Sequence, residues 1–154
     1  MSAAPTVRLD HVGLCVPDLE QATAFFVEAF GATVVFRLDR IRDPEGGSMQ
    51  RIGANRAAEF EAVMLEMAGG RLELLQWWSG ESRAEQPAAM DVGASHLAMQ
   101  TPDLRATLAV LRQMPGVVVM GEPVTFLEGA TPGLSNAFVR TPWGTILELV
   151  NWGD

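Results

Sequence analysis

The sequence predicts an α+β fold made of two tandem copies of one β-α-β-β-β module. Residues 11–19 and 96–104 both read His, five residues, then Pro-Asp-Leu. Residues 72–77 and 147–152 both read Leu-Glu-Leu, an aliphatic residue, an amide and Trp. Because a repeat of this kind determines the architecture of a chain, we expect a single domain over residues 1–154. Its first module spans 7–78, a linker spans 79–93, and the second module spans 94–152.

The first module is expected to hold four strands and one helix. Residues 11–16 form a short apolar run that ends at a proline, which is typical of a strand. Asp18 then caps a helix with an apolar stripe from Leu19 onward, and Gly31 ends it. Residues 32–39 predict a β-branched strand. Residues 59–68 and 71–77 predict two more strands, joined by a Gly69-Gly70 hairpin turn.

The second module repeats this order in a shorter form. Residues 95–101 predict its first strand, and Asp103 caps a helix that Pro115-Gly116 ends. Residues 117–120 predict the next strand, and residues 136–140 and 145–152 predict a hairpin. Three stretches read as loops, at 42–56, 79–92 and 127–135; loops on a rigid sheet commonly determine substrate selectivity.

Composition excludes several classes of function. Nineteen acidic and eleven basic residues give a net charge of −8, which disfavours nucleic acid and anionic membranes as partners. No apolar run approaches the roughly 18 residues of a membrane span. Residues 1–6 do not resemble a signal peptide, so we expect a cytoplasmic protein. The single Cys15 leaves no internal disulfide, and we expect its thiol to act as a small buried hydrophobe.

The marked polar residues of the two modules are expected to share one face of a curved sheet. Strand alternation places His11 with Gly13, and Glu73 with Leu75 and Trp77, on the face away from the helix. His96, Glu148 and Trp152 occupy the repeat-equivalent positions. Two imidazoles and two carboxylates in an apolar cleft make a site for a divalent ion. Duplication alone would also preserve four purely structural residues, and this alternative stays open.

At these residues the sequence resembles the vicinal oxygen chelate superfamily, which includes glyoxalase I, methylmalonyl-CoA epimerase, extradiol dioxygenases and bleomycin-resistance proteins. The resemblance rests on residues 10–14 with 17–20, on 72–75, on 95–98 and on 141–149. It implies paired modules that form a U-shaped mixed sheet around a cleft, with the helices on the outer face. The ligands it implies for one divalent metal ion, whether nickel, cobalt, manganese, zinc or iron, are His11, Glu73, His96 and Glu148.

A His, Glu, His, Glu set resembles the four-ligand branch around glyoxalase I. The hypothesis is therefore a metal-dependent lyase or isomerase that transfers a proton next to the carbonyl of a small substrate, with Glu148 or Glu73 taking the proton. Predicted substrate contacts are Trp77, Trp152, Arg51, Arg140 and Asn136. The usual Pro-Asp-Gly turn of glyoxalase I is Pro142-Trp143-Gly144 here, which predicts a large aromatic at the rim of the cleft.

Two other functions stay open. The first is a non-haem iron dioxygenase on the same scaffold, which Glu73 disfavours because that branch typically uses three ligands. The second is a non-catalytic binding or resistance protein for an aromatic compound. The superfamily resemblance also implies a homodimer, with the site built either within one chain or across two.

Overall fold

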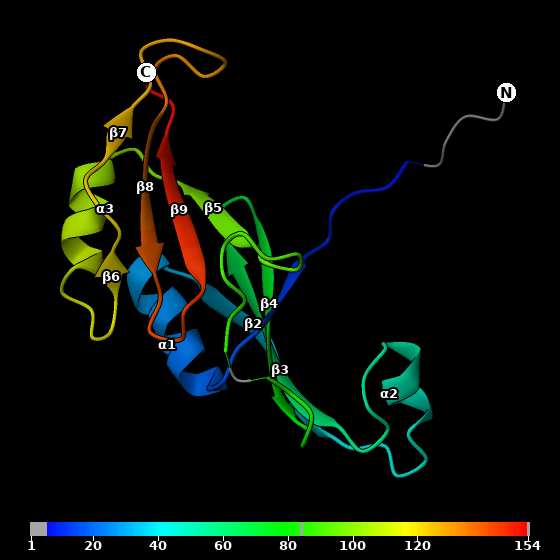
Figure 1. The fold of residues 1–154 in the computed structure, drawn as a ribbon. Helices are drawn as coiled ribbons and strands as arrows, with labels where there is room; N and C mark the ends of the chain where they lie inside the picture. Colours follow the sequence, from blue (N-terminus) through cyan, green and yellow to red (C-terminus); the bar gives the residue numbers. More distant parts are fainter. Residues whose placement is uncertain (1–5, 84, 154) are drawn as a thin grey trace, which may run out of the picture. The chain divides into compact units, whose positions relative to one another are not determined.

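The computed structural model describes residues 6–83 and 85–153, and the chain divides into two compact units, Met1–Ser82 and Arg83–Asp154. Each unit has its own mixed sheet and one main helix (Figure 1). The α+β class and the two β-α-β-β-β modules predicted from the sequence are confirmed.

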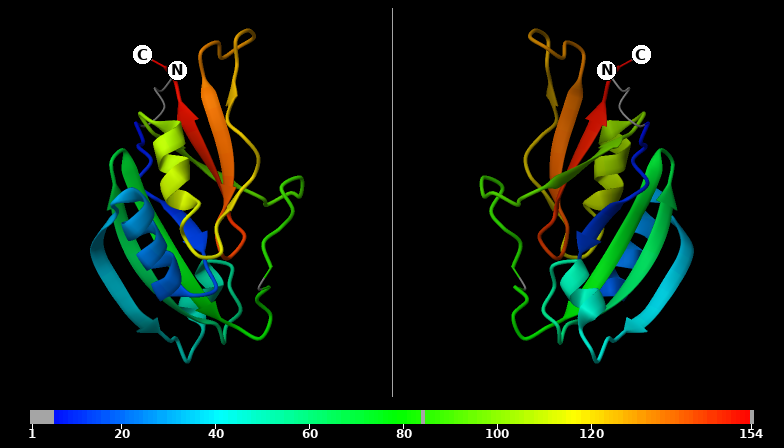
Figure 2. Two further views of the ribbon diagram at one scale, coloured as in Figure 1. Left: turned by 90° about the vertical axis from the view of Figure 1, so that its left-hand side faces the viewer. Right: turned by 90° about the vertical axis from the view of Figure 1, so that its right-hand side faces the viewer.

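The first unit holds a four-stranded sheet with the strand order β1-β4-β3-β2. Its elements are β1 (Val12–Cys15), α1 (Leu19–Phe30), β2 (Thr33–Ile41), α2 (Gly47–Arg51), β3 (Glu59–Met67) and β4 (Gly70–Trp78). β1 runs parallel to β4, and the other pairs are antiparallel. Figure 2 shows α1 lying across one face of this sheet, where it packs on β3 and β4.

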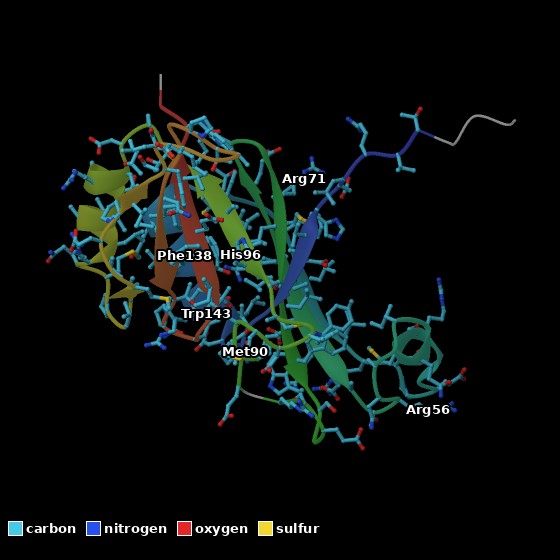
Figure 3. All side chains as sticks on the ribbon, turned by 45° about the horizontal axis from the view of Figure 1, so that its top comes forward. Arg56, Arg71, Met90, His96, Phe138 and Trp143 are labelled. Carbon is cyan, nitrogen blue, oxygen red and sulfur yellow. The ribbon has the colours of Figure 1, made fainter. Side chains whose placement is uncertain are left out.

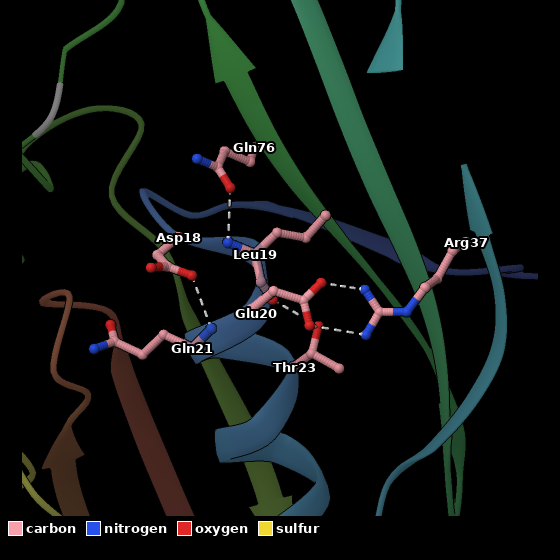
Figure 4. Close-up of polar contacts among 7 residues, drawn as sticks. All are labelled: Asp18, Leu19, Glu20, Gln21, Thr23, Arg37 and Gln76. Atoms are coloured by element: carbon pink, nitrogen blue, oxygen red, sulfur yellow. Dashed lines mark hydrogen bonds and ion pairs between the residues drawn. The ribbon is translucent and has the colours of Figure 1, made fainter. Parts of the chain in front are cut away.

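Local chemistry fixes both ends of α1, and Figure 4 shows the N-terminal end. Asp18 accepts a hydrogen bond from the backbone N–H of Gln21 at 2.9 Å, as an N-cap should. At the other end Gly31 has φ 65, a left-handed conformation that favours glycine, and it donates to the carbonyl of Val27. Gln76 of β4 accepts from the N–H of Leu19 and so ties the start of the helix to the sheet.

The second unit holds β5 (His96–Gln100), α3 (Leu104–Leu111), β6 (Val118–Val119), β7 (Val124–Thr125), β8 (Ser135–Arg140) and β9 (Ile146–Asn151). β5 runs parallel to β9, β8 lies beside β9, and both β6 and β7 pair with β8. α3 packs on β8 and β9. The two short strands β6 and β7 together correspond to the nine-residue β2 of the first unit. The break falls at Gly121 to Pro123, where proline has no N–H for a ladder.

Each core is made by the helix and by the sheet face beneath it. Phe26, Leu72 and Leu74 are fully buried in the first unit, and Leu108, Leu147 and Leu149 are fully buried in the second. Glu73 and Glu148 alternate with these leucines along their strands and therefore point to the opposite face. The core thus determines which face of each sheet carries the predicted ligands.

Two expectations were wrong. The loop predicted at 42–56 contains the short helix α2, which lies beyond the ends of β2 and β3 (Figure 1). Cys15 is exposed rather than buried, because it lies on the face of β1 that the helix does not cover.

Candidate metal and substrate site

In the first unit a histidine and a glutamate face each other across two parallel strands. His11 directly precedes β1, and Gly13, two residues on, is the register partner of Glu73 in β4. Residues two apart on a strand point to the same side. His11 Nε2 therefore lies 3.6 Å from Glu73 Oε2, and the Glu73 side chain is 21% exposed.

The second unit repeats the same geometry. His96 begins β5, and Ala98, two residues on, is the register partner of Glu148 in β9. His96 Nε2 lies 3.4 Å from Glu148 Oε2, and the Glu148 side chain is 17% exposed. The repeated sequence thus produces a repeated His–Glu pair with the same two atoms facing each other.

His11 has a second polar partner, and no residue of the described chain takes the corresponding place at His96. Asp10 Oδ1 lies 2.8 Å from His11 Nδ1, and this hydrogen bond lowers the pKa of the Asp10 carboxyl below its ordinary value. A neutral His11 that donates from Nδ1 to Asp10 carries its lone pair on Nε2, the nitrogen that faces Glu73. Ser95 occupies the position of Asp10 in the second copy.

Glu148 also has a second polar partner, which has no counterpart at Glu73 within residues 6–83 and 85–153. Asn136 Nδ2, on β8, donates to Glu148 Oε1 at 2.7 Å. The sequence predicted Asn136 as a substrate contact; the structure places its amide on the carboxylate of a predicted ligand.

Both His–Glu pairs have the donor chemistry of a divalent metal site. Two atoms bonded to one ion at about 2.1 Å lie about 3.0–3.4 Å apart, depending on the bond angle, close to the separations in the two units. Imidazole nitrogen and carboxylate oxygen suit zinc, nickel, manganese and iron. Among residues 6–83 and 85–153, no group of three or more His, Cys, Asp and Glu side chains is placed to hold one ion. Each His–Glu pair by itself offers two donors.

A largely apolar pocket lies beside His96 in the second unit. Its volume is about 290 Å³. Figure 3 shows His96 next to Phe138, whose ring lies edge-on to the imidazole with the centroids 6.4 Å apart. The pocket is also lined by Met120, by residues of the linker and of the segment that leads into β5, and by residues of the β8–β9 turn and the start of β9: Gln86, Pro87, Ala89, Ala94, Ser95, Gly144, Thr145 and Ile146.

Sequence reasoning did not identify this pocket. Phe138 is the register partner of Glu148, so strand alternation could have placed its ring on the ligand face. The contribution of the linker had no signal in the sequence, because residues 86–94 contain neither a motif nor a regular apolar pattern.

The other predicted substrate contacts are spread over their units. Trp77 is half-buried and stacks on Phe60 with the ring centroids 4.8 Å apart. Trp152 follows β9 and is 53% exposed. Arg140 ends β8 and is exposed. Arg51 lines a polar hollow of about 680 Å³ with Arg42, Arg56 and the acidic residues beside them.

The expectation for Trp143 was wrong. Its side chain is 8% exposed, and Nε1 donates to Thr145 Oγ1 at 2.8 Å. The indole packs inside the second unit instead of forming an aromatic rim, because a buried indole N–H needs an acceptor and Thr145 supplies one within the turn.

Two β-α-β-β-β units, each with a His–Glu pair on parallel strands, define a class of duplicated-module proteins. A family model for the glyoxalase/bleomycin resistance protein/dioxygenase superfamily matches residues 10–131. The chain belongs to this superfamily, as the resemblance at the sequence level predicted.

Several characterised and solved proteins are similar to it. A 2-epi-5-epi-valiolone epimerase from Actinomyces sp. is 36% identical over 147 residues, which cover 94% of this chain and 79% of the relative. A glyoxalase family protein from Bacillus cereus has a TM-score of 0.76 at 19% identity, over 98% of this chain and 97% of that one. Glyoxalase I from Leishmania major has a TM-score of 0.62 at 23% identity, over 96% and 88%. The last two show the shared fold.

The described residues include no helix that is long and apolar enough to cross a membrane.

Proposed function

We propose that this protein is a divalent-metal-dependent isomerase or glyoxalase-type lyase that transfers a proton at the carbon next to a carbonyl of a small substrate. The observation that carries the proposal is the repeated pair, with His Nε2 and Glu Oε2 at 3.6 Å in one unit and 3.4 Å in the other. A duplication that kept only structural residues would not need an imidazole nitrogen facing a carboxylate oxygen twice.

In this proposal His11, Glu73, His96 and Glu148 together hold one ion, within one chain or between the chains of a homodimer. The ion is nickel, cobalt, manganese, zinc or iron, since affinity order alone does not determine which metal a cell supplies. When bound, such an ion supplies Lewis acidity that stabilises negative charge on a substrate oxygen.

The chain's own residues carry the proton. A carboxylate, Glu73 or Glu148, takes the proton from the C–H bond beside the carbonyl, and the electron pair of that bond moves towards the carbonyl oxygen. A proton delivered to the opposite face of that carbon inverts the centre, and a proton delivered to the neighbouring carbon relocates the carbonyl. Phe138 and Met120 make part of the nearby pocket apolar, and exclusion of water strengthens both the charge stabilisation and the proton transfer.

The substrate we propose is a small ketone of the kind named by the 36% identical relative, 2-epi-5-epi-valiolone. The match to this epimerase covers 94% of the chain. It therefore supports an epimerase more than a glutathione-dependent lyase. Trp77, Trp152, Arg51 and Arg140 remain proposed contacts for the body and any acidic group of the substrate.

The homodimer is also a proposal. β2 is an edge strand, and Val34, Val35, Phe36 and Leu38 along it are each about two-fifths exposed. Natural proteins generally cover or blunt a long apolar edge strand. We therefore propose that a second copy of the chain covers β2. Sedimentation equilibrium would show a dimer mass, and a monomer at micromolar concentration would contradict this assignment.

The test of function is deuterium incorporation from D2O into 2-epi-5-epi-valiolone, followed by NMR with protein reconstituted separately with each candidate metal. We expect exchange at the carbon next to the ketone, dependent on added metal and lost in Glu73→Gln with Glu148→Gln. Glu128→Gln, in the exposed loop 126–134, is the matched control and should keep the exchange rate.

Other outcomes identify other functions. Stoichiometric iron with oxygen uptake on a catechol would indicate the dioxygenase. Tight binding of an aromatic ligand, with no metal and no exchange, would indicate a binding protein.

A further inference from the structure

The pocket beside His96 has the size of a site for one small molecule. Its volume of about 290 Å³ lies at the lower limit of the roughly 300–1,000 Å³ that is typical of small-molecule sites. The sheet supplies an apolar side of the pocket, where the ring of Phe138 lies edge-on to the imidazole (Figure 3). Met120 and Ile146 add to this apolar side. The space is sufficient for a single substituted carbon ring.

The linker supplies another side of the pocket and has a fixed local structure. Asp91 Oδ2 accepts from the N–H of Ala88 at 2.9 Å. The N–H of Asp91 donates to the carbonyl of Ala88 at 2.8 Å, and the N–H of Ala94 donates to the carbonyl of Asp91 at 3.0 Å. These three hydrogen bonds hold residues 88–94 in one turn, so this side of the pocket is built by the linker itself.

Gln86 is held in place while its amide stays free. A Cβ built at Gly144 would lie 3.2 Å from Gln86 Cγ, so the stem of Gln86 packs directly on this glycine. Within residues 6–83 and 85–153, neither the Gln86 amide nor the Ser95 hydroxyl has a hydrogen-bond partner. Thr145 Oγ1, a further polar atom of the lining, already accepts from Trp143. A carboxamide both donates and accepts, which suits Gln86 to bind a hydroxyl group.

The pocket offers no positive side chain to an anion. Among residues 6–83 and 85–153, those that line it include no Arg, Asp or Glu. The charged residues of the segment 85–94 are Glu85 and Asp91, both acidic. His96 is neutral when it binds a metal ion, and Glu73 and Glu148 balance the charge of a divalent ion in the proposed site. A phosphate or carboxylate in this pocket would lose hydration without gaining a cationic partner, which is costly.

The repeat shows that these features belong to the second unit. The counterparts of Phe138 and Ser95 in the first unit are Met64 and Asp10. Asp10 is a carboxylate and is hydrogen-bonded to His11. The second unit therefore has an aromatic ring and an unpaired hydroxyl where the first unit has a thioether and a paired charge.

From the size, the free amide and the lack of a cation we infer that this pocket holds the ring of an uncharged, hydroxylated ketone. The C–H face of the ring packs on Phe138, and one hydroxyl binds the amide of Gln86. These two side chains are then specificity-determining residues. The inference rests on the proposed function, which it narrows to substrates without a phosphate or carboxylate group.

The first test concerns charge. Titration calorimetry compares binding of 2-epi-5-epi-valiolone and of its phosphate monoester to the metal-loaded protein. We expect the uncharged ketone to bind at least about tenfold more tightly, because the ester would bury an unpaired charge. Met120→Arg, at a position of the lining that is 49% exposed, supplies a cation and should raise the affinity for the ester about tenfold.

The second test concerns the amide. Gln86→Leu keeps the size of the side chain and removes its polar atoms, so it should weaken ketone binding about fivefold. It should raise KM for deuterium exchange by the same factor and leave kcat unchanged. The wild-type protein should bind one monodeoxy analogue of the ketone about fivefold more weakly than the ketone. Gln86→Leu should not distinguish the two, since the hydroxyl and the amide act as a pair.

Two further variants complete this series. Phe138→Leu removes the ring and should bind the ketone several-fold more weakly than Phe138→Tyr, which keeps it. Gln113→Leu is the matched control: this glutamine is exposed beyond the end of α3, and its loss should leave ketone affinity and the exchange rate as in the wild-type protein.

The outcomes are separable. Equal binding of the ketone and the ester by the wild-type protein would overturn the charge selection, and wild-type affinity in Gln86→Leu would overturn the role of Gln86. In either case metal-dependent exchange would leave the proposed function standing. The expected binding pattern without any exchange would overturn the proposed function and keep the pocket assignment. Neither binding nor exchange with any of the candidate metals would overturn both.

Discussion

The two modules pair their strands in the same register around Glu73 and Glu148. They differ in single residues beside these two glutamates. Asn136 and Ala62 occupy corresponding places, and only Asn136 reaches a carboxylate. The sequence predicted Asn136 as a site residue but assigned it to the substrate. The hydrogen bond to Glu148, twelve positions away in the sequence, could have been expected only from the register of β8 on β9.

At the same scale, the leucines beside the two glutamates should be equally important for stability. Leu74 and Leu149 are fully buried at corresponding positions. Replacement of either by Ala should lower the free energy of unfolding by about 2–5 kcal/mol, since each leaves a cavity in a packed core. Leu127→Ala, at an 82% exposed position, should change it by no more than about 0.5 kcal/mol.

Denaturant unfolding followed by circular dichroism measures these differences. A loss below about 1 kcal/mol in either buried variant would show that this leucine is not part of the core of its unit.

Among the elements, those with a strong periodic pattern and a cap were predicted well. α1 runs from Leu19 to Phe30 between its predicted cap and its predicted glycine stop. The hairpin turn was predicted one residue too late: it falls at Ala68 and Gly69, and Gly70 begins β4 as the register partner of Met67. The helix α2 and the strand β7 were missed because each is too short for a hydrophobic period. Their positions depend on side-chain contacts and on strand pairing that are not visible in a local pattern.

The loop that holds α2 depends on one carboxylate and should therefore respond to acid. Asp43 Oδ2 accepts from the N–H of Ser48 at 2.7 Å, and Oδ1 accepts from the N–H of Glu45 at 3.0 Å. The backbone hydrogen bond from Ser48 is the main reason that the pKa of Asp43 lies below its ordinary value.

Because the folded pKa is lowered, the ionised form stabilises the loop. That contribution is fully present above the unfolded value of about 3.9 and is lost as pH falls through the folded pKa. NMR should show the Ser48 amide losing exchange protection over this range. In Asp43→Asn the protection should no longer depend on this titration, and an unaltered acid transition in that variant would contradict the assignment.

For the whole molecule, most of the correct predictions of the fold came from the internal repeat. It predicted two modules, their element order, and a His and a Glu on one face in each, because strand alternation follows from the chain alone. The register that sets each His opposite its Glu is given by the structure. The pocket beside His96 could not be predicted, since linker residues that have no pattern of their own form part of its wall. The expectation that Trp143 forms an aromatic rim was also wrong. The indole N–H donates to Thr145 in the same turn, and this hydrogen bond allows the ring to be buried.

The central claim is that the two His–Glu pairs serve one metal site. Elemental analysis of untagged protein, purified without chelator, tests it beside His11→Ala and His96→Ala. The account predicts about one divalent ion per site in the wild-type protein, and loss of that ion in either variant, since each removes a ligand of the same ion. Retention of metal in both variants, or no stoichiometric metal in any of the three proteins even after incubation with the candidate ions, would contradict it.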